Sequence, residues 1–512
     1  MTASSLYLVE IFTPYNIEFR TDPAPRARCG GVKMSAYDDI QQSILDFVDP
    51  ANTLIWHIAF VFVIGLGIAF TIKLRGVQLT RIRESAKLAT SGVSEGKHSQ
   101  RLSSFEAFCV GMGARIGVGN IAGVATAIVT GGPGAVFWMW IFAIIGAASS
   151  FMESTLAQIY KEKKSDGGFH GGPAYYAYKG LGSRTMGIVL AILIVFTFGI
   201  GFVAVQAANA SSALIGAFDF EGNNIVFALI IAGLAALIIF SGVKMAGKFS
   251  ARIVPLMALA WLVFAIIAIC LNIGGVANAF VMIFEYAFSV PSLLGGAVGT
   301  IIMVGLKRGV FSNEAGLGSV ANVAATADVK HPAKQGLIQG FGVLVDTLLI
   351  CTITALVVLS YGSYEDIMAF GQRGAPLVQS IVSSTAIGDI APYLIAIFMF
   401  VFAFTSLVGY YTMSEANARF VRDKKAPIMA IRILVILVAF IAAYTANMAL
   451  MDGISDTFMA VMGAVNMIVV AMLSRKVFEC YRDYRRQKKA GIEEPEFHRS
   501  TLSDDTGVTE WE

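Results

Sequence analysis

GARIGVGNIAGVATAIVTGG, Gly113 to Gly132, lies in one of the most apolar regions of the chain, yet it contains six glycines, an arginine and an asparagine. Glycine weakens helices, and arginine and asparagine resist burial among apolar groups. Such a segment is suited to an interrupted helix, because glycine accepts unwound backbone conformations and lets other atoms approach the backbone closely. The stretch therefore predicts a buried helix that is broken near Gly117 to Asn120.

The composition is typical of a membrane protein. Of the 512 residues, 56% are hydrophobic and only 14% are charged, whereas a soluble domain usually has about 25% charged residues. Each membrane-spanning helix takes roughly 20 apolar residues, so a chain of this length has room for many of them. The five cysteines and five histidines are scattered without the spacing of a zinc site, and the cysteines are interpreted as small core residues.

Long apolar runs predict an all-α polytopic membrane protein with eleven transmembrane helices. In chain order, spans 1 to 11 lie at about 53–73, 105–130, 133–160, 185–217, 224–242, 250–272, 297–326, 334–360, 389–417, 427–447 and 453–475.

Lysine and arginine favour the loops on one side of the predicted membrane. Most of the 38 basic residues fall in the loops after spans 1, 3, 5, 7 and 9 and in the tail after span 11, while the alternate loops hold only Arg373. Short basic loops stay in the cytoplasm, so the N-terminus is expected outside and the C-terminus inside. In the first basic loop, LRGVQLTRIRESAKLATSG (Leu74 to Gly92) is either an amphipathic helix on the membrane surface or a polar loop.

Both ends of the chain differ in composition from the apolar part. Residues 1–50 form an N-terminal segment in which no cleavable signal is convincing, because the basic residues follow the apolar ones. Met34 is a plausible alternative start, and the first 33 residues have no predicted structural role. Residues 51–476 form the predicted transmembrane domain, and residues 477–512 form a charged cytoplasmic tail.

Spans 2 and 7 share the pattern R-x4-N-x-A-G, which runs from Arg115 to Gly123 and from Arg308 to Gly316. The two spans lie five apart and therefore run in opposite directions, as an inverted repeat requires. We expect spans 2–6, about 105–272, to be repeated by spans 7–11, about 297–475, with span 1 as an extra helix. A break in the first helix of each repeat exposes amides at one half-helix end and carbonyls at the other, and can hold an anion and a cation close together.

Close helix packing is the alternative role for the glycines of span 2. Gly113 with Gly117, and Gly119 with Gly123, both match the GxxxG packing pattern. We favour packing for Gly123 and a helix break for Gly117 and Gly119.

Charged residues inside the spans need partners, because they would be costly facing lipid. An ion pair at a gate between Arg115 and Glu314 is one hypothesis. For Glu153, Lys307 and Glu415, the alternative is a place near the membrane interface. The full set is Arg115, Glu153, Lys307, Arg308, Glu314, Asp346 and Glu415.

Enzyme motifs are not convincing in this sequence. GVKMAGKF (Gly242 to Phe249) matches G-x4-G-K, but Phe249 stands where serine or threonine would hold magnesium, and no strand precedes it. GVGNIAG also lacks a preceding strand, and no HExxH or Ser/His/Asp set is suggested by spacing. The sequence therefore favours a transporter or a channel over an enzyme.

Four stretches resemble the alanine or glycine:cation symporter family, which comprises bacterial sodium-coupled amino-acid carriers. They are GVGNIAGVATAI and GGPGAVFWMW in spans 2 and 3, GGPAYY at Gly171 to Tyr176, and GLKRGVFSNEAGLGSVANVAA at Gly305 to Ala325. The resemblance extends from about Trp56 to span 11. It implies a LeuT-type fold, with a five-plus-five inverted repeat, in a bacterial inner membrane.

The resemblance also implies a substrate site at the breaks. Amides of the unwound segment of span 2 would receive the substrate carboxylate, and carbonyls of spans 2 and 7 would receive the ammonium. Gln206 and Asn209 in span 4 are then candidates to hydrogen-bond the zwitterion, with helix-to-helix hydrogen bonding as the alternative. The predicted substrate-binding residues are Gly117, Gly119, Asn120, Gln206, Asn209, Phe311 and Asn313.

Thr405 and Ser406 in span 9 resemble the hydroxyl pair that binds sodium in this fold. Their oxygens would be joined by backbone carbonyls of Gly113, Ile116 and Phe402, a set that suits a hard monovalent cation. The alternative is that both hydroxyls bond back to their own helix. Arg115 falls at the level of the backbone ligands, so its side chain is expected to point elsewhere.

We predict a secondary active transporter that carries alanine or glycine into the cell with sodium by alternating access. Glycines leave room beside the backbone, and Phe311 and Trp138 would close the cavity above a short side chain. The expected partners are the amino acid, co-transported sodium and the lipid bilayer, without nucleic acid. The alternatives are a proton-coupled carrier of another small neutral amino acid and a channel, which would not accumulate its substrate against a gradient.

Overall fold

The computed structural model describes residues 36–90, 102–164, 167–241, 243–288 and 297–512. The chain divides into two units, Met1–Ile44 and Leu45–Glu512. Apart from the first residues of α1, every described helix belongs to the second unit. The stretch that matches G-x4-G-K, rejected above as a phosphate-binding loop, begins at Gly242, a residue outside the described ranges.

Within the described residues, nine uninterrupted helical segments are long and apolar enough to cross a membrane. They are formed by α1 (Ala36–Lys73), α6 (Gly134–Ile159), α8 with α9 (Arg184–Ile194, Val203–Ala217), α10 (Asn223–Ser241), α11 (Val243–Leu271), α16 with α17 (Pro332–Leu344, Thr352–Leu359), α20 (Ala391–Val421), α21 (Lys425–Thr445) and α22 (Met448–Lys489). Wide π-helical turns join α8 to α9 at Val195–Phe202 and α16 to α17 at Val345–Cys351.

The remaining two predicted spans are broken in the middle. Span 2 consists of α4 (Ser104–Arg115) and α5 (Ala122–Gly131), separated by a single 3₁₀ turn at Val118–Asn120. Span 7 consists of α14 (Ala297–Asn313) and α15 (Ser319–Ala324). In the segment between α14 and α15, Glu314, Gly316 and Gly318 have positive φ angles of 56°, 84° and 70°. Glycine adopts such angles at little cost. The nine uninterrupted segments and these two broken helices agree with the prediction of about eleven spans.

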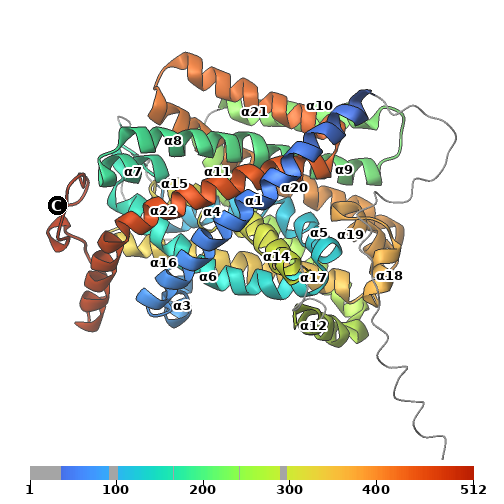
Figure 1. The fold of residues 1–512 in the computed structure, drawn as a ribbon, viewed down its shortest axis with the longest axis horizontal. Coiled ribbons are helices and arrows are strands. Elements are labelled where there is room, and N and C mark those ends of the chain that lie inside the picture. The colour runs from blue at the N-terminus through green and yellow to red at the C-terminus, as the bar shows by residue number, and fades with distance from the viewer. Residues whose placement is uncertain (1–35, 91–101, 165–166, 242, 289–296) are drawn as a thin grey trace, which may run out of the picture. The chain divides into compact units, whose positions relative to one another are not determined.

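The repeat organises the helices into two groups. The first helices of each repeat, α4/α5 and α14/α15, pack with the second helices, α6 and α16/α17, and we call these spans 2, 3, 7 and 8 the first group. Spans 4, 5, 9 and 10, formed by α8/α9, α10, α20 and α21, pack mainly with one another and are called the second group. In Figure 1, α10 and α21 lie at the top, and α6, α16 and α17 lie at the bottom.

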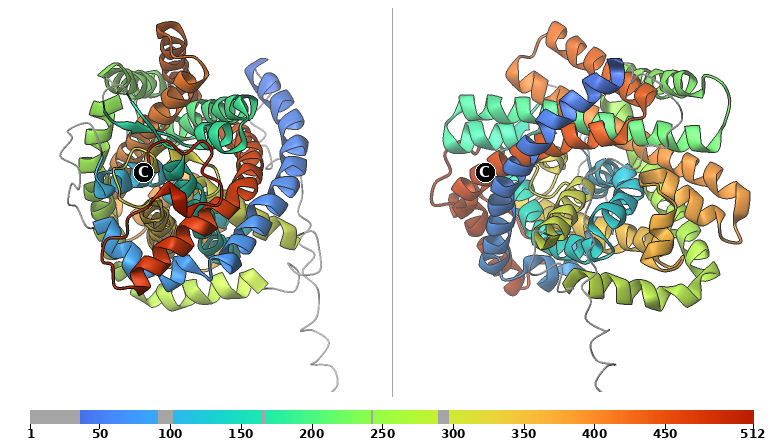
Figure 2. Two further views of the ribbon diagram at one scale, coloured as in Figure 1. Left: turned by 90° about the vertical axis from the view of Figure 1, so that its left-hand side faces the viewer. Right: turned by 45° about the vertical axis from the view of Figure 1, so that its right-hand side comes forward.

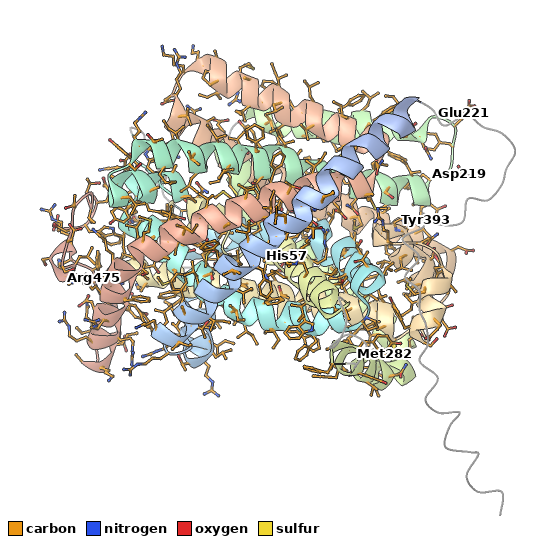
Figure 3. The ribbon with its side chains drawn as sticks, in the orientation of Figure 1. His57, Asp219, Glu221, Met282, Tyr393 and Arg475 are labelled. Atoms are coloured by element: carbon orange, nitrogen blue, oxygen red, sulfur yellow. The ribbon has the colours of Figure 1, made fainter. Side chains whose placement is uncertain are left out.

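Short elements lie at the two ends of the spans. At one end are α2 (Val77–Thr80), α3 (Ile82–Thr90), the antiparallel pair β1 (Glu162–Lys163) and β2 (Phe169–His170), and α7 (Pro173–Leu181). Connections at the opposite end contain α12 (Ile273–Phe288), α18 (Tyr364–Ala369) and α19 (Gly374–Ser383). Figure 3 shows Arg475 at the first end and Asp219 and Glu221 at the other, in keeping with the uneven placement of charge in the sequence.

The loop after span 1 is helical, as the amphipathic interpretation expects. It forms α2 and α3, and its described part ends at Thr90. Val77 and Ala89 are fully buried and α3 packs against α16, while Leu79 and Ile82 remain exposed. The segment is thus partly a packing element rather than a free polar loop.

Residues after α22 fold back against the ends of the spans, and the left view of Figure 2 shows the C-terminus lying over them. The indole nitrogen of Trp511 donates to the carbonyl of Gln158 at 2.9 Å, and the ammonium of Lys161 lies 4.4 Å from the indole ring centre. Phe497 packs edge-on against Trp511 and its amide donates to the Lys330 carbonyl. The charged tail therefore carries an apolar anchor.

Candidate functional site

Three oxygens meet where α4 ends and α20 passes. The hydroxyl of Ser406 donates to the carbonyl of Gly113 at 3.1 Å and lies 3.5 Å from the carbonyl of Ile116. One carbonyl belongs to the last turn of α4 and the other to the residue after α4. Carbonyls at a helix end have no amide of the next turn to accept from, so they are open to other donors or to a cation. Ser406 and Gly113 are separated by 293 residues, and their contact joins the two groups of helices.

Thr405 lies beside Ser406 but bonds within its own helix. Its hydroxyl donates to the carbonyls of Phe402 at 3.0 Å and Val401 at 3.2 Å. Back-bonding, the alternative interpretation, is therefore observed for Thr405, whereas Ser406 bonds across to span 2. The structure brings Phe402, Thr405, Ser406, Gly113 and Ile116 together in this chain of contacts.

On the far side of the break, side chains occupy the freed amides. The carboxamide oxygen of Gln206 accepts from the Val118 amide at 3.0 Å, and the side-chain oxygen of Asn120 accepts from the Gly117 amide at 2.9 Å. Gln206 also donates to the hydroxyl of Tyr410 at 3.4 Å. These partners are neutral, so a carboxylate that displaced the Gln206 oxygen would gain a stronger, charge-assisted hydrogen bond.

Asn120 links the break to a buried carboxylate that sequence reasoning left unassigned. Its side-chain nitrogen donates to Asp346 at 2.7 Å, and the hydroxyl of Ser312 donates to the other oxygen of Asp346 at 2.7 Å. Asp346 lies in the π-helical turn of span 8 and is fully buried. Spans 2, 7 and 8 thus meet at a single carboxylate.

The glycines of span 2 differ in how much room surrounds them. A Cβ atom on Gly117 would lie 2.6 Å from the Ser406 hydroxyl, and one on Gly119 would lie 3.0 Å from the Phe311 ring. A Cβ on Gly123 would meet only the Phe311 ring, at 3.9 Å. The sequence favours close packing at Gly123, but the structure has room for a Cβ atom there. Gly117 and Gly119 are the positions at which neighbouring groups leave too little room for a Cβ atom. Phe311 also packs against Phe202, with ring centres 4.7 Å apart.

The break of span 7 is closed by charged side chains. Glu153 accepts from the amides of Gly318 at 2.9 Å and Gly316 at 3.4 Å, where α15 begins. The guanidinium of Arg115 donates to the carbonyl of Asn313, where α14 ends, at 2.8 Å. An anion at a helix N-terminus and a cation at a C-terminus both oppose the helix dipole favourably.

Asn209 and Asn313, two of the predicted substrate-binding residues, form hydrogen bonds within their own helix or with helices of their own group. Asn209 donates back to the carbonyl of Val205 in its own helix at 3.0 Å, and this bond is neither of the two roles predicted for its side chain. Asn313 donates to Thr347 at 3.0 Å and accepts from the Ala315 amide at 3.0 Å, which stabilises the break of span 7.

The predicted ion pair between Arg115 and Glu314 is absent from the described residues, and this hypothesis is wrong. Glu314 instead accepts from Ser319 at 2.5 Å. Arg308 of span 7 forms ion pairs with two carboxylates of α22, Asp456 at 2.6 Å and Asp452 at 3.3 Å. Glu153 is buried at the break rather than near an interface.

Sequence reasoning missed Tyr410 as a contact of the site. Its hydroxyl donates to the carbonyl of Ala114 at 3.0 Å, next to the bonds of Ser406. Its position four residues after Ser406 places both side chains on one face of α20, and this spacing was the available signal.

Comparison with known proteins identifies relatives over most of the chain. The model of the sodium:alanine symporter family matches residues 41–499. The probable sodium/glutamine symporter GlnT of Bacillus subtilis is 43% identical over 474 residues, covering 92% of this chain and 97% of the relative. The sodium/alanine symporter AgcS of Methanococcus maripaludis is 36% identical over 439 residues, covering 84% and 95%. The crystal structure of MhsT in complex with L-phenylalanine has a TM-score of 0.55 at 14% identity, covering 74% and 90%, and so shares the fold.

Proposed function

The chain belongs to the sodium:alanine symporter family, a family of multi-pass amino-acid symporters, and from this premise we propose that it couples inward sodium movement to the uptake of alanine or glycine. The observation that carries the sodium proposal is the bond of Ser406 to the last carbonyls of α4. Hydroxyl and carbonyl oxygens are the ligands a hard cation prefers, and the end of α4 adds the negative pole of a half-helix dipole. The cation would be held by Gly113, Ile116, Phe402, Thr405 and Ser406.

The substrate carboxylate would bind the amides of the 3₁₀ turn in place of Gln206. Val118 donates its amide to Gln206 at 3.0 Å, and Gln206 has a second partner in Tyr410 to which it can turn. Gly117, Gly119 and Asn120 form the surrounding backbone. Asn209 and Asn313 are the further substrate-binding residues that the sequence predicts. Since the break of span 7 is closed by Glu153 of span 3 and Arg115 of span 2, we assign the substrate to span 2.

Phe311 supports a small substrate. Its ring lies against Gly119, so a long side chain would have to displace both Phe311 and the Phe202 ring behind it. A relative named as a probable sodium/glutamine symporter is 43% identical, and glutamine is therefore the rival substrate. Phe311→Ala should admit glutamine in competition with alanine, while the wild type should prefer alanine or glycine.

Uptake into proteoliposomes tests the coupling. Labelled alanine should accumulate against its gradient when sodium is high outside, and this uptake should disappear when choline replaces sodium, even if a proton gradient is kept. Uptake that continues in choline with a proton gradient would establish the proton-coupled alternative. Flux that never exceeds equilibrium would identify a channel.

A further inference from the structure

Arg115 is a fully enclosed arginine whose side chain reaches three other helices. Its guanidinium donates to the Asn313 carbonyl of span 7 at 2.8 Å, to the Gln339 carbonyl of span 8 at 2.9 Å, and to the Ser150 hydroxyl of span 3 at 2.9 Å. The residue is 1% exposed. Together with its own helix, these are the four spans of the first group.

Backbone atoms on either side of Arg115 face the other way. The carbonyls of Gly113 and Ala114 accept from Ser406 and Tyr410 of α20, which belongs to the second group. At one turn of α4, therefore, the side chain binds one group of helices and the backbone binds the other. The predicted sodium site lies on the backbone side of this turn.

The space and the hydrogen-bond acceptors around the Arg115 side chain fit a planar guanidinium better than an ammonium. A Cβ atom on Gly342 would clash with Nη1 of Arg115, so glycine at this position leaves the space that the fork occupies. Its bonds leave from three separate nitrogens, Nε, Nη1 and Nη2, which a planar guanidinium offers, whereas an ammonium has its three donors on one nitrogen. The carbonyl end of α14 meets the guanidinium at Asn313, and its positive charge opposes the dipole of that half-helix.

We propose that Arg115 is a positioning residue that makes the first group move as one body and carries the effect of sodium at the end of α4 to the break of span 7. The inference rests on the proposed sodium-coupled function. Sodium would order the backbone carbonyls of span 2, and the guanidinium would then fix the Asn313 end of α14, which bears Phe311 against the substrate. Without the guanidinium, each ligand would still have its own contacts, but neither would favour the other.

Equilibrium binding of labelled alanine to the purified full-length protein, with and without sodium, tests this inference. In the wild type, sodium should tighten alanine binding about tenfold or more, which is within the usual range of coupling between sites. Arg115→Met should reduce the effect of sodium to about twofold or less, while alanine still binds. Arg115→Lys should fall between the two, because it keeps the charge without the fork.

Gly342→Ala provides a variant that keeps Arg115 but displaces its guanidinium, and it should also weaken the effect of sodium. Its matched control is Gly309→Ala, since a Cβ there makes only ordinary contacts, the nearest at 3.6 Å from Met139. A purely structural role would lower the yield of folded protein without changing the ratio of the two affinities. If Arg115→Met does not fold, Gly342→Ala decides.

The possible outcomes are distinct. Loss of the sodium effect in the Arg115 and Gly342 variants, with Gly309→Ala unchanged, supports the proposal. A wild-type sodium effect that survives Arg115→Met or Gly342→Ala overturns it while leaving the proposed function intact. Wild-type behaviour of Arg115→Lys would show that charge alone suffices, and would overturn the three-way link. If sodium has no effect on the wild type, both the inference and the proposed coupling fail.

Discussion

Replacing Trp511 by alanine should release the C-terminal tail from the ends of the spans. Its indole is 8% exposed, bonds to Gln158 and packs against Lys161 and Phe497. Truncating a buried tryptophan to alanine costs ~3–5 kcal/mol. Each 1.4 kcal/mol changes an equilibrium about tenfold, so the undocked population should rise roughly a hundredfold or more. Trp511→Phe keeps the ring contacts but loses the N–H bond, worth about 1 kcal/mol.

Trypsin cleavage after Arg499 measures this release. The backbone amide of Arg499 donates to the carbonyl of Glu512. This hydrogen bond fixes the backbone at the cleavage site while the tail is docked and is lost when the tail is released. When reclosing is fast compared with cleavage, the cleavage rate follows the open population. Cleavage should accelerate strongly in Trp511→Ala, about fivefold in Trp511→Phe, and not at all in the neighbouring control Glu510→Ala. An unchanged rate in Trp511→Ala would refute an anchor at this residue.

Docking of the tail has a defined pH dependence, which hydrogen exchange can follow in acid, where trypsin does not cleave. The hydrogen bond from Lys476 lowers the pKa of Asp504 well below its usual value. A lowered pKa in the docked state stabilises docking above the pKa of the free carboxyl, about 3.9, and this contribution is lost as the pH falls through the docked pKa. The protection of the Arg499 amide against hydrogen exchange, corrected for the intrinsic rate at each pH, should therefore not change through Asp504 near neutral pH and should decline as the pH falls below about 4.

Three further substitutions test the site and the buried ion pairs of Arg308. Ser406→Ala should raise the sodium concentration for half-maximal uptake about tenfold, or ~1.4 kcal/mol, whereas Thr412→Ala, which removes only a bond within α20, should not. Gly117→Ala should abolish sodium-dependent uptake of alanine because its Cβ would meet the Ser406 hydroxyl at 2.6 Å, and normal uptake would contradict the close approach. Arg308→Met should lower the free energy of unfolding of the purified protein by ~3–5 kcal/mol, because it removes the cation that pairs with buried Asp456 and with Asp452, and Arg308→Met with Asp456→Asn should recover part of it.

The breaks and the repeat were predictable because their signals are local. Glycine at 117 and 119 lets Ser406 and Phe311 approach the unwound backbone closely, and Gly316 and Gly318 have the positive φ angles that glycine favours. The shared R-x4-N-x-A-G pattern then relates two spans of opposite direction. The placement of Ser406 against span 2 was implied by family resemblance, and the structure brings these residues together.

The partners of the buried charges could not be predicted, because they depend on which helices become neighbours. Glu153 lies 165 residues before Gly318, whose amide it accepts. Arg115 lies 198 residues before the carbonyl it binds. Opposite charge alone suggested Glu314 for Arg115, but a backbone carbonyl is an equally good acceptor and leaves no pattern in the sequence. The apolar anchor of the tail was hidden in the same way by the charged residues around it.

The shared motif of spans 2 and 7 leads to two different kinds of break. In span 7, Glu153 and Arg115 supply a fixed anion and cation to the two half-helix ends, so those ends need no ligand. In span 2, the carbonyl of Gly113 and the amide of Val118 are bound by neutral groups, Ser406 and Gln206. Charged ligands bind such ends more strongly than neutral side chains do. An ion and a zwitterion would therefore compete well at span 2 and poorly at span 7, so an inverted repeat with two similar breaks can still offer one site for transport.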